Sequence, residues 1–177
     1  RSLGELEIPF VVEADALEAI HRELLARNGL TEGMVYLQVT RGAADRDFAY
    51  PEAATPSLVL FTQAKALIDA PSARSGIKVV TVPDIRWARR DIKSVMLLAP
   101  VLGKQAAYEQ GAAEGWMVEN GKVTEGTSSN AYIVKNGKVI TRELSNSILA
   151  GCTRRALMRL AKEHGIEIIE RAFTPEE

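Results

Sequence analysis

Residues 116–143 read WMVENGKVTEGTSSNAYIVKNGKVITRE, and this stretch decides the fold class. Asn-Gly occurs twice in it, beginning at Asn120 and at Asn136, each time between two apolar runs. Because Asn-Gly accepts the positive φ angles of a type I′ turn, each pair predicts a β-hairpin. The sequence therefore predicts two hairpins, over residues 116–126 and 131–143.

Helical patterns lie on both sides of the hairpins. Apolar residues recur at helical spacing over residues 13–28, which predicts an amphipathic helix. A second helix is expected over residues 95–110, with its regular part beginning near Ala99 because Pro100 suits only a first turn. A third helix is expected over residues 153–164.

Short runs rich in β-branched and aromatic residues predict further strands. These runs cover residues 34–41, 58–62, 77–82 and 166–171. Helices, hairpins and strands follow one another without the regular alternation of a doubly wound sheet, so the predicted fold class is α+β. Residues 64–76 are rich in Ala and Ser and have no strand pattern, which predicts an interdomain linker. A first domain is then expected over residues 1–63 and a second over residues 77–177.

The composition is that of an ordinary globular protein, with 46% hydrophobic and 25% charged residues in a chain of 177. Lys and Arg total 22 against 23 Asp and Glu, and this net charge of −1 argues against a nucleic-acid or anionic-membrane partner. The single cysteine forms no internal disulfide, and neither histidine has a neighbour at metal-ligand spacing. No apolar run approaches the roughly 18 residues of a membrane-spanning helix, and no signal-peptide pattern is present. We therefore expect a cytoplasmic protein without a metal site.

The first candidate for chemistry is RRDIKS, residues 89–94, where a lysine lies among two arginines and an aspartate. Neighbouring cations or burial lower the pKa of a lysine amine from about 10.4, as a Schiff-base nucleophile near neutral pH requires. Lys93 is therefore a candidate reactive amine. Taken alone, the hexapeptide is more typical of a solvated charged loop.

The second candidate is VTEGTSSN, residues 123–130, which joins the two hairpins. One carboxylate beside three hydroxyl residues and an asparagine is suited to holding a phosphorylated cationic ring. The same residue types also dominate ordinary polar turns, so this segment alone leaves both interpretations open.

Two weaker candidates involve anion binding. Gly151, Cys152 and Thr153 lead into the last expected helix, whose N-terminal N–H groups could hold a phosphate. Every helix has such an end, and Thr153 is more often a plain N-cap. Residues 38–48, QVTRGAADRDF, carry Arg41 and Arg46 in a polar loop, where either guanidinium could bind a carboxylate, although surface arginines are common.

In their order along the chain these segments resemble the fold-type IV pyridoxal-phosphate enzymes, aminotransferase class IV, and within them the D-amino-acid aminotransferase branch. The resemblance spans nearly the whole chain. Its anchors are VYLQVTRG (35–42), DIRWARRDIKS (84–94), LLAPVLGKQ (97–105), VTEGTSSN (123–130) and ILAGCTR (148–154). It implies a two-domain architecture in which residues 1–63 are the C-terminal part of the small domain and residues 77–177 most of the large cofactor-binding domain.

The resemblance implies pyridoxal 5′-phosphate as cofactor and a role for each candidate around it. Lys93 would form the internal aldimine and then move a proton between the substrate Cα and the cofactor's C4′ carbon. Glu125 would pair with the pyridinium nitrogen, and Leu149 would pack on the ring face. The N–H groups of Cys152 and Thr153 would hold the phosphate.

On the substrate side, the resemblance implies that residues 127–130 form a border, with Ser128 toward the cofactor and Ser129 toward the substrate. Arg46 falls where the D-amino-acid enzymes keep an arginine for the substrate α-carboxylate. Phe48 stands where the best-known members have a histidine, and this departure bears on substrate preference.

The implied reaction is transfer of an amino group from an amino acid of D-alanine type to a 2-oxo acid, by an enzyme that is at least a homodimer. Two alternatives share the fold: aminodeoxychorismate lyase, which eliminates pyruvate, and branched-chain aminotransferase. Arg46 favours the D-amino-acid enzymes over the branched-chain ones, and Phe48 weakens that preference. A non-catalytic interaction module is a third alternative, against which the presence of both Lys93 and Glu125 argues.

Both ends of the chain are expected to be incomplete. The sequence opens at Arg1 without a methionine and stops at residues 174–177, a run typical of a helix start. The resemblance implies further segments at each end that supply phosphate contacts. We therefore expect these 177 residues alone to bind the cofactor weakly and to show almost no turnover, which an activity assay on a chain of verified length checks.

Overall fold

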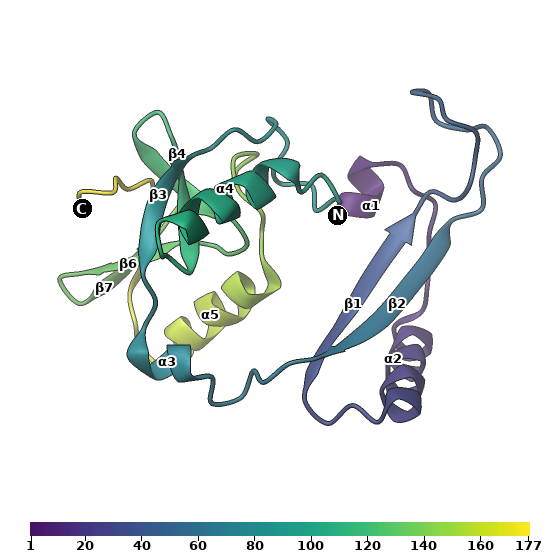
Figure 1. Cartoon of the computed structure of the whole chain (residues 1–177), viewed down its shortest axis with the longest axis horizontal. Helices are drawn as coiled ribbons and strands as arrows, with labels where there is room; N and C mark the ends of the chain where they lie inside the picture. The colour runs from purple at the N-terminus through teal and green to yellow at the C-terminus, as the bar shows by residue number, and fades with distance from the viewer. The chain divides into compact units, whose positions relative to one another are not determined.

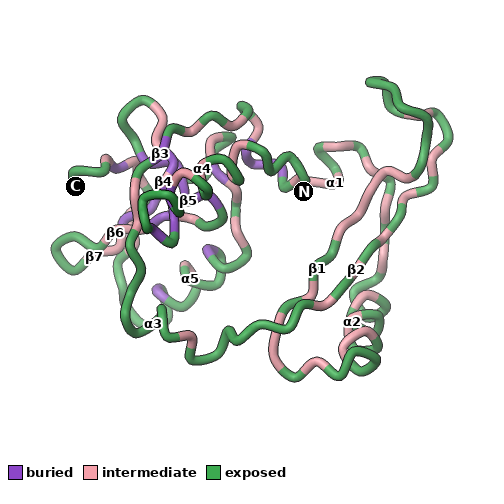
Figure 2. Tube along the Cα trace, in the orientation of Figure 1, coloured by how far each residue is buried: buried purple, intermediate pink, exposed green.

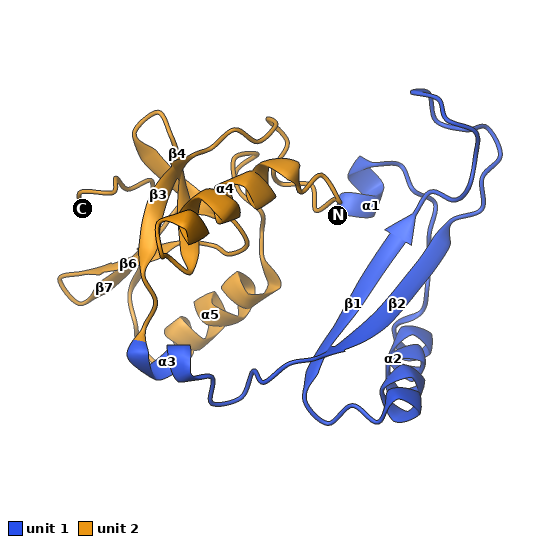
Figure 3. Ribbon diagram, in the orientation of Figure 1, with its two compact units in different colours: residues 1–75 blue, residues 76–177 orange.

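The computed structural model describes residues 1–177 and divides them into two compact units, residues 1–75 and residues 76–177 (Figure 3). Unit 1 contains α1 (Ser2–Glu5), α2 (Ala14–Asn28), β1 (Gly33–Thr40), β2 (Ser57–Ala64) and α3 (Pro71–Ser75). Unit 2 contains β3 (Val79–Pro83), α4 (Leu98–Glu109), β4 (Glu114–Glu119), β5 (Lys122–Gly126), β6 (Tyr132–Lys135), β7 (Lys138–Thr141), α5 (Cys152–Glu163) and β8 (Ile168–Glu170) (Figure 1). Each unit combines helices with strands, which confirms the α+β class.

Unit 1 is a long hairpin with a helix beside it. β1 and β2 pair antiparallel, from Gly33 opposite Ala64 to Thr40 opposite Ser57. Helix α2 begins after an extended N-cap and ends at Gly29, whose φ of 57° is the left-handed conformation that commonly ends a helix. The predicted helix over residues 13–28 and both predicted strands are therefore confirmed within one or two residues.

Unit 2 contains two three-stranded sheets. β3 pairs parallel with β4, which pairs antiparallel with β5, while β6 pairs antiparallel with β7, which pairs parallel with β8. Both Asn-Gly turns have the positive φ angles expected of them: 51° and 71° at Asn120 and Gly121, and 53° and 75° at Asn136 and Gly137. The two predicted hairpins are therefore confirmed.

All buried residues belong to unit 2, and Figure 2 draws their segments in purple. One cluster joins the two hairpins through Val123, Ala131, Ile140 and Phe173. The Trp116 ring meets the Phe173 ring edge-on, with centroids 5.8 Å apart. Burying these apolar surfaces between the sheets stabilises the strand β5 on which the candidate site is built.

The structure adds two short helices that the sequence did not predict. Helix α1 has four residues and α3 has five, and α3 lies inside the segment interpreted as a linker. A helix of about one turn cannot show the recurrence of apolar residues over two turns on which the sequence prediction depends. No helix of the chain combines the length and the apolar character that crossing a membrane requires.

Candidate active site

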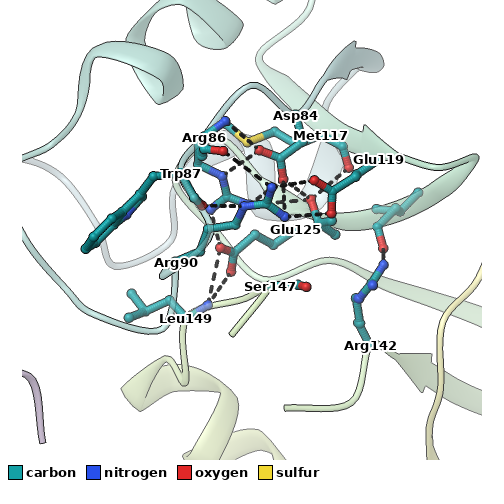
Figure 4. Close-up of polar contacts among 12 residues, drawn as sticks. Asp84, Arg86, Trp87, Arg90, Met117, Glu119, Glu125, Arg142, Ser147 and Leu149 are labelled. Carbon is teal, nitrogen blue, oxygen red and sulfur yellow. Dashed lines mark hydrogen bonds and ion pairs between the residues drawn. The ribbon is translucent and has the colours of Figure 1, made fainter. Parts of the chain in front are cut away.

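Glu125 is a buried carboxylate held by donors from three different segments. It belongs to β5, and 6% of its side chain is exposed. Its oxygens accept hydrogen bonds from the Arg86 guanidinium and from the Leu149 N–H at 3.1 Å (Figure 4). They also accept one from Asn130 Nδ2 at 3.0 Å. Several donors converging on one carboxylate create a position suited to holding a negative charge.

Arg86 binds two buried carboxylates at once. Its Nε and Nη2 donate to the oxygens of Asp84 at 2.9 and 2.8 Å, while Nη1 donates to Glu125. Thr124 Oγ1 also donates to Asp84, at 2.6 Å. Arg86 has 11% of its side chain exposed and Asp84 has none. Because buried charges are tolerated only when they are paired and hydrogen-bonded, Arg86 determines where the Glu125 carboxylate lies.

The two carboxylates that share Arg86 differ in their pKa values. Burial acts on both by raising the pKa. At Asp84 the hydrogen bonds from Arg86 and Thr124 outweigh burial, so its pKa lies below the ordinary value. At Glu125 burial outweighs the bond from Arg86 and the Leu149 N–H, so its pKa is raised. Glu125 is therefore the member of the pair whose charge is more easily neutralised.

Lys93 lies in the loop that follows β3, and this loop is anchored before the lysine is reached. Arg90 donates to the Glu119 carboxylate on β4 at 3.0 and 2.6 Å, and its backbone N–H donates to the Asn146 carbonyl at 3.0 Å. Ile92 is buried with 6% exposure, whereas its neighbour Lys93 is exposed. The loop therefore holds Lys93 on a fixed segment while a small molecule can reach its side chain.

The expected phosphate end also has a suitable geometry. Gly151 is the N-cap of α5 and has no side chain that could cap the helix. Cys152 and Thr153, the first two residues of the helix, are exposed. The first N–H groups of an α-helix have no partner within the helix and attract anions. A Cβ at Gly151 would lie 2.5 Å from Asn130 Oδ1, so the absence of a side chain lets this turn approach the loop that binds Glu125.

Ser128 and Ser129 lie on the surface of unit 2, in a loop that is closed by a short backbone bond. The Gly126 N–H donates to the Ser129 carbonyl at 2.6 Å. Both serine residues are exposed, yet their hydroxyl groups donate inward to Glu114 at 3.1 and 3.0 Å. Asn130 therefore links Glu125 to Leu149, whereas the side chains of the two serines are bonded to Glu114.

Replacing Gly126 by alanine is expected to destabilise the chain by about 1–3 kcal/mol, because the added Cβ would overlap Ser129 Oγ and lie 3.1 Å from its carbonyl oxygen. Urea unfolding measures the loss. Gly4→Ala is the matched control, since a Cβ there meets nothing within 4 Å. Equal free energies of unfolding for the two variants would contradict the prediction.

Arg46 and Phe48 lie in unit 1, in the loop between β1 and β2. The Arg46 guanidinium lies 5.5 Å from the Phe48 ring centroid, and Phe48 is 93% exposed. Arg41, the other arginine of this loop, donates to the backbone carbonyls of Leu6 and Glu7. Arg46 instead lies against the Phe48 ring. Arg46 and Phe48 thus contact each other, and both belong to unit 1, whereas the candidate cofactor-binding residues belong to unit 2.

The family model described as Amino-transferase class IV matches residues 1–177. The chain belongs to this family. A D-alanine aminotransferase of Bacillus licheniformis is 37% identical over 179 residues, which are 100% of this chain and 62% of the relative. This class IV aminotransferase chain therefore spans less than two thirds of the length of that relative.

Two solved structures show the same fold at low identity. A putative 4-amino-4-deoxychorismate lyase from Legionella pneumophila has a TM-score of 0.85 and 22% identity, covering 99% of this chain and 65% of its own. A branched-chain aminotransferase from Thermobaculum terrenum, in a PLP form, has a TM-score of 0.76 and 20% identity, covering 99% and 59%. Class IV aminotransferases depend on pyridoxal 5′-phosphate, and the expectation of this family and cofactor is confirmed.

The donor set of this class IV aminotransferase fits that cofactor chemically. A phosphorylated pyridinium needs an amine for its aldehyde, a carboxylate for its ring nitrogen and N–H groups for its phosphate. Unit 2 provides all three, at Lys93, at Glu125 and at the start of α5. The residues present therefore match the cofactor of the family.

Sequence reasoning missed two residues that organise this candidate site, Arg86 and Glu114. The sequence motif DIRW contains Arg86 but does not indicate what it binds. Its partners Asp84 and Glu125 are 2 and 39 residues away, and only folding brings the three together. Glu114 opens a buried strand, where it is 6% exposed. An acidic residue in a strand with buried neighbours was the available signal, since such a charge needs several donors.

Proposed function

We propose that this chain is the greater part of a pyridoxal-phosphate-dependent transaminase that transfers an amino group from an amino acid of D-alanine type to a 2-oxo acid. The observation that carries the proposal is the buried Glu125 carboxylate, held by Arg86, Asn130 and the Leu149 N–H on the unit that also contains Lys93. Two relatives that are 37% identical to this chain are D-alanine aminotransferases.

Glu125 accepts the N–H of the pyridinium ring. When bound, the cofactor supplies an electron-withdrawing ring that stabilises negative charge at the substrate Cα. The donors around Glu125 fix its carboxylate before any ligand arrives, so little reorganisation is needed. The raised pKa of Glu125, caused by its burial, makes the carboxylate a strong acceptor for a charged N–H.

Lys93 is the nucleophile and the proton carrier. Its amine would hold the cofactor through the aldehyde carbon, and the same amine would move a proton at the substrate Cα. The anchored loop, in which Arg90 holds β4 and Ile92 is buried, limits how far the Lys93 backbone can move. A positioned amine is what proton transfer at a single carbon requires.

The remaining candidates surround these two groups. The Cys152 and Thr153 N–H groups hold the phosphate, Leu149 packs on the ring face, and Ser128 lies beside the cofactor. On the substrate side, Ser129 lies at the border, Arg46 binds the α-carboxylate, and the exposed Phe48 ring influences which side chain is accepted. Arginine suits the carboxylate role because its planar fork binds two oxygens at once.

Several broader features belong to the same proposal. Residues 1–63 form part of the small domain, residues 64–76 the linker and residues 77–177 most of the cofactor domain, in a cytoplasmic enzyme. At least a homodimer is expected, because the family places its sites near a subunit interface. The exposed apolar residues of β1 and β2, among them Met34, Tyr36, Val59 and Phe61, support an assembly in which this surface is covered.

The experiment adds pyridoxal 5′-phosphate and D-alanine to the chain and measures pyridoxamine 5′-phosphate and pyruvate. The expected result is stoichiometric formation of both from D-alanine, and a single turnover suffices for this readout. Formation of the amine from L-leucine but not D-alanine would identify a branched-chain aminotransferase. Pyruvate release from aminodeoxychorismate, with no reaction of D-alanine or L-leucine, would identify the lyase. A chain that takes up the cofactor and still reacts with none of the three compounds would favour the interaction module.

A further inference from the structure

A second buried carboxylate, which the proposed function does not use, lies against the serine loop, residues 127–129. Glu114 is the first residue of β4, and 8% of its side chain is exposed. Its carboxylate accepts hydrogen bonds from the hydroxyl groups of Thr127, of Ser128 at 3.1 Å and of Ser129 at 3.0 Å. All three hydroxyl groups of the loop thus share one acceptor.

The charge on Glu114 determines the direction of these three bonds. Burial raises the pKa of Glu114, but the bonds from Thr127 and from the Gly115 N–H, with the charge of Lys104 at 3.3 Å, lower it by more. An ionised carboxylate can accept hydrogen bonds but not donate them. Each hydroxyl therefore donates its only hydrogen to Glu114, and only lone pairs remain for any other partner.

The serine loop adjoins the proposed cofactor site at both of its ends. It follows Glu125 by two residues, and Asn130, the next residue after it, donates back to Glu125 at 3.0 Å and to the Leu149 carbonyl at 2.9 Å. Ser128 and Ser129 are exposed residues on the loop that leads from Glu125 to Asn130, so a ligand that extends beyond Glu125 can meet them there.

We propose that Glu114 is a positioning residue that holds Ser128 and Ser129 as hydrogen-bond acceptors, so that the serine loop selects a ligand group that carries hydrogen. The amine of the aminated cofactor or of the amino-acid substrate is such a group, whereas a carboxylate or carbonyl oxygen would face only lone pairs. This inference rests on the proposed function and deepens it by naming the chemistry that the loop recognises.

Glu114→Gln reverses this arrangement with little change in shape. The Gly115 N–H, at 2.8 Å, and Lys104 both point at Oε1, so the amide oxygen of the glutamine must occupy that position. Its NH₂ group then takes the position of Oε2, which faces Ser128 and Ser129. The two serines accept from the amide and turn their own hydrogens outward, which makes them donors to a ligand.

The test compares pyridoxamine 5′-phosphate with 4-deoxypyridoxine 5′-phosphate, which carries a methyl group in place of the aminomethyl group. Both bind without a covalent bond, and titration calorimetry on the chain gives their dissociation constants. In Glu114→Gln, affinity for the amine compound is expected to fall roughly tenfold or more, since it loses a hydrogen bond to a charged group. Affinity for the deoxy compound is expected to stay within about threefold. Glu109→Gln, on the exposed face of α4, is the matched control and should change neither.

A second variant keeps the test valid if circular dichroism shows that Glu114→Gln is unfolded. Ser128→Ala/Ser129→Ala removes the two acceptors and leaves Thr127 and the Gly115 N–H bound to Glu114, and it should lower the affinity for the amine compound selectively. Equal losses for both compounds would overturn the inference, because a merely structural role affects them alike. Because these residues alone are expected to bind weakly, the titrations use each compound in large excess. If the unaltered chain bound neither compound even then, the proposed function itself would be wrong, and the inference with it.

Discussion

Lys93→Ala is expected to abolish the covalent attachment of pyridoxal 5′-phosphate to this chain. Borohydride reduction traps the cofactor on the amine that holds it, and Lys93 lies on an anchored loop of the unit that contains Glu125. Intact mass before and after reduction, followed by peptide mapping, measures the adduct. We expect one phosphopyridoxyl group on Lys93 of the unaltered chain and none on the variant.

A control variant shows whether loss of the adduct is specific to Lys93 or follows from removing any lysine. Lys162→Ala removes an exposed lysine from α5 of the same unit and should leave the adduct at its full level. Because Lys93 is exposed, the alanine variant should also keep its free energy of unfolding within about 0.5 kcal/mol. An adduct that persists undiminished in Lys93→Ala, or that maps to another lysine of the unaltered chain, would exclude Lys93 as the nucleophile.

Arg86→Met is expected to lower the free energy of unfolding by about 3–5 kcal/mol at neutral pH, because it removes the cation bound to buried Glu125 and leaves Asp84 with only Arg90, at 3.4 Å. The pKa of Asp84 is lowered by its bonds to Arg86 and Thr124 despite burial, so this group stabilises the fold above its unfolded pKa. Without Arg86 both carboxyls take up protons more readily. The deficit should therefore shrink as the pH falls through the range in which unfolded carboxylates titrate.

Urea unfolding of Arg86→Met as a function of pH measures both effects. Arg159→Met provides a surface comparison, since Arg159 and its partner Glu163 have 66% and 49% of their side chains exposed. Exposed ion pairs of this kind contribute less than about 1 kcal/mol. An Arg86→Met variant as stable as Arg159→Met, or one whose deficit does not depend on pH, would show that Arg86 does not hold the two carboxylates.

The parts of the fold that sequence could predict are local. Asn120-Gly121 and Asn136-Gly137 specify their hairpins because the turn geometry depends on two adjacent residues. Helix α2 shows its apolar recurrence over fifteen residues, and its bounds were predicted within one residue. Helices α1 and α3 escaped because four or five residues are too few for any periodicity.

The sequence predicted the residue types of the candidate site but not the contacts between them. The residue types in RRDIKS and VTEGTSSN indicated an amine and a carboxylate, and the order of the motifs indicated the family. The partners of Glu125 could not be predicted, since Arg86 and Leu149 are 39 and 24 residues away in the sequence. Which donor meets a carboxylate depends on how β3, β4 and β5 pair and on which side chains that pairing buries.

By itself, the sequence determined the hairpins, the main helices and the presence of Lys93 and Glu125, because these depend on neighbouring residues and on residue chemistry. Only the tertiary structure decided that Arg86 holds Asp84 and Glu125 together and that Glu114 takes the three hydroxyl hydrogens of the serine loop. The physical reason is that hydrogen-bond partners are chosen by distance and burial in the folded chain, and burial makes an unpaired charge too costly to remain alone.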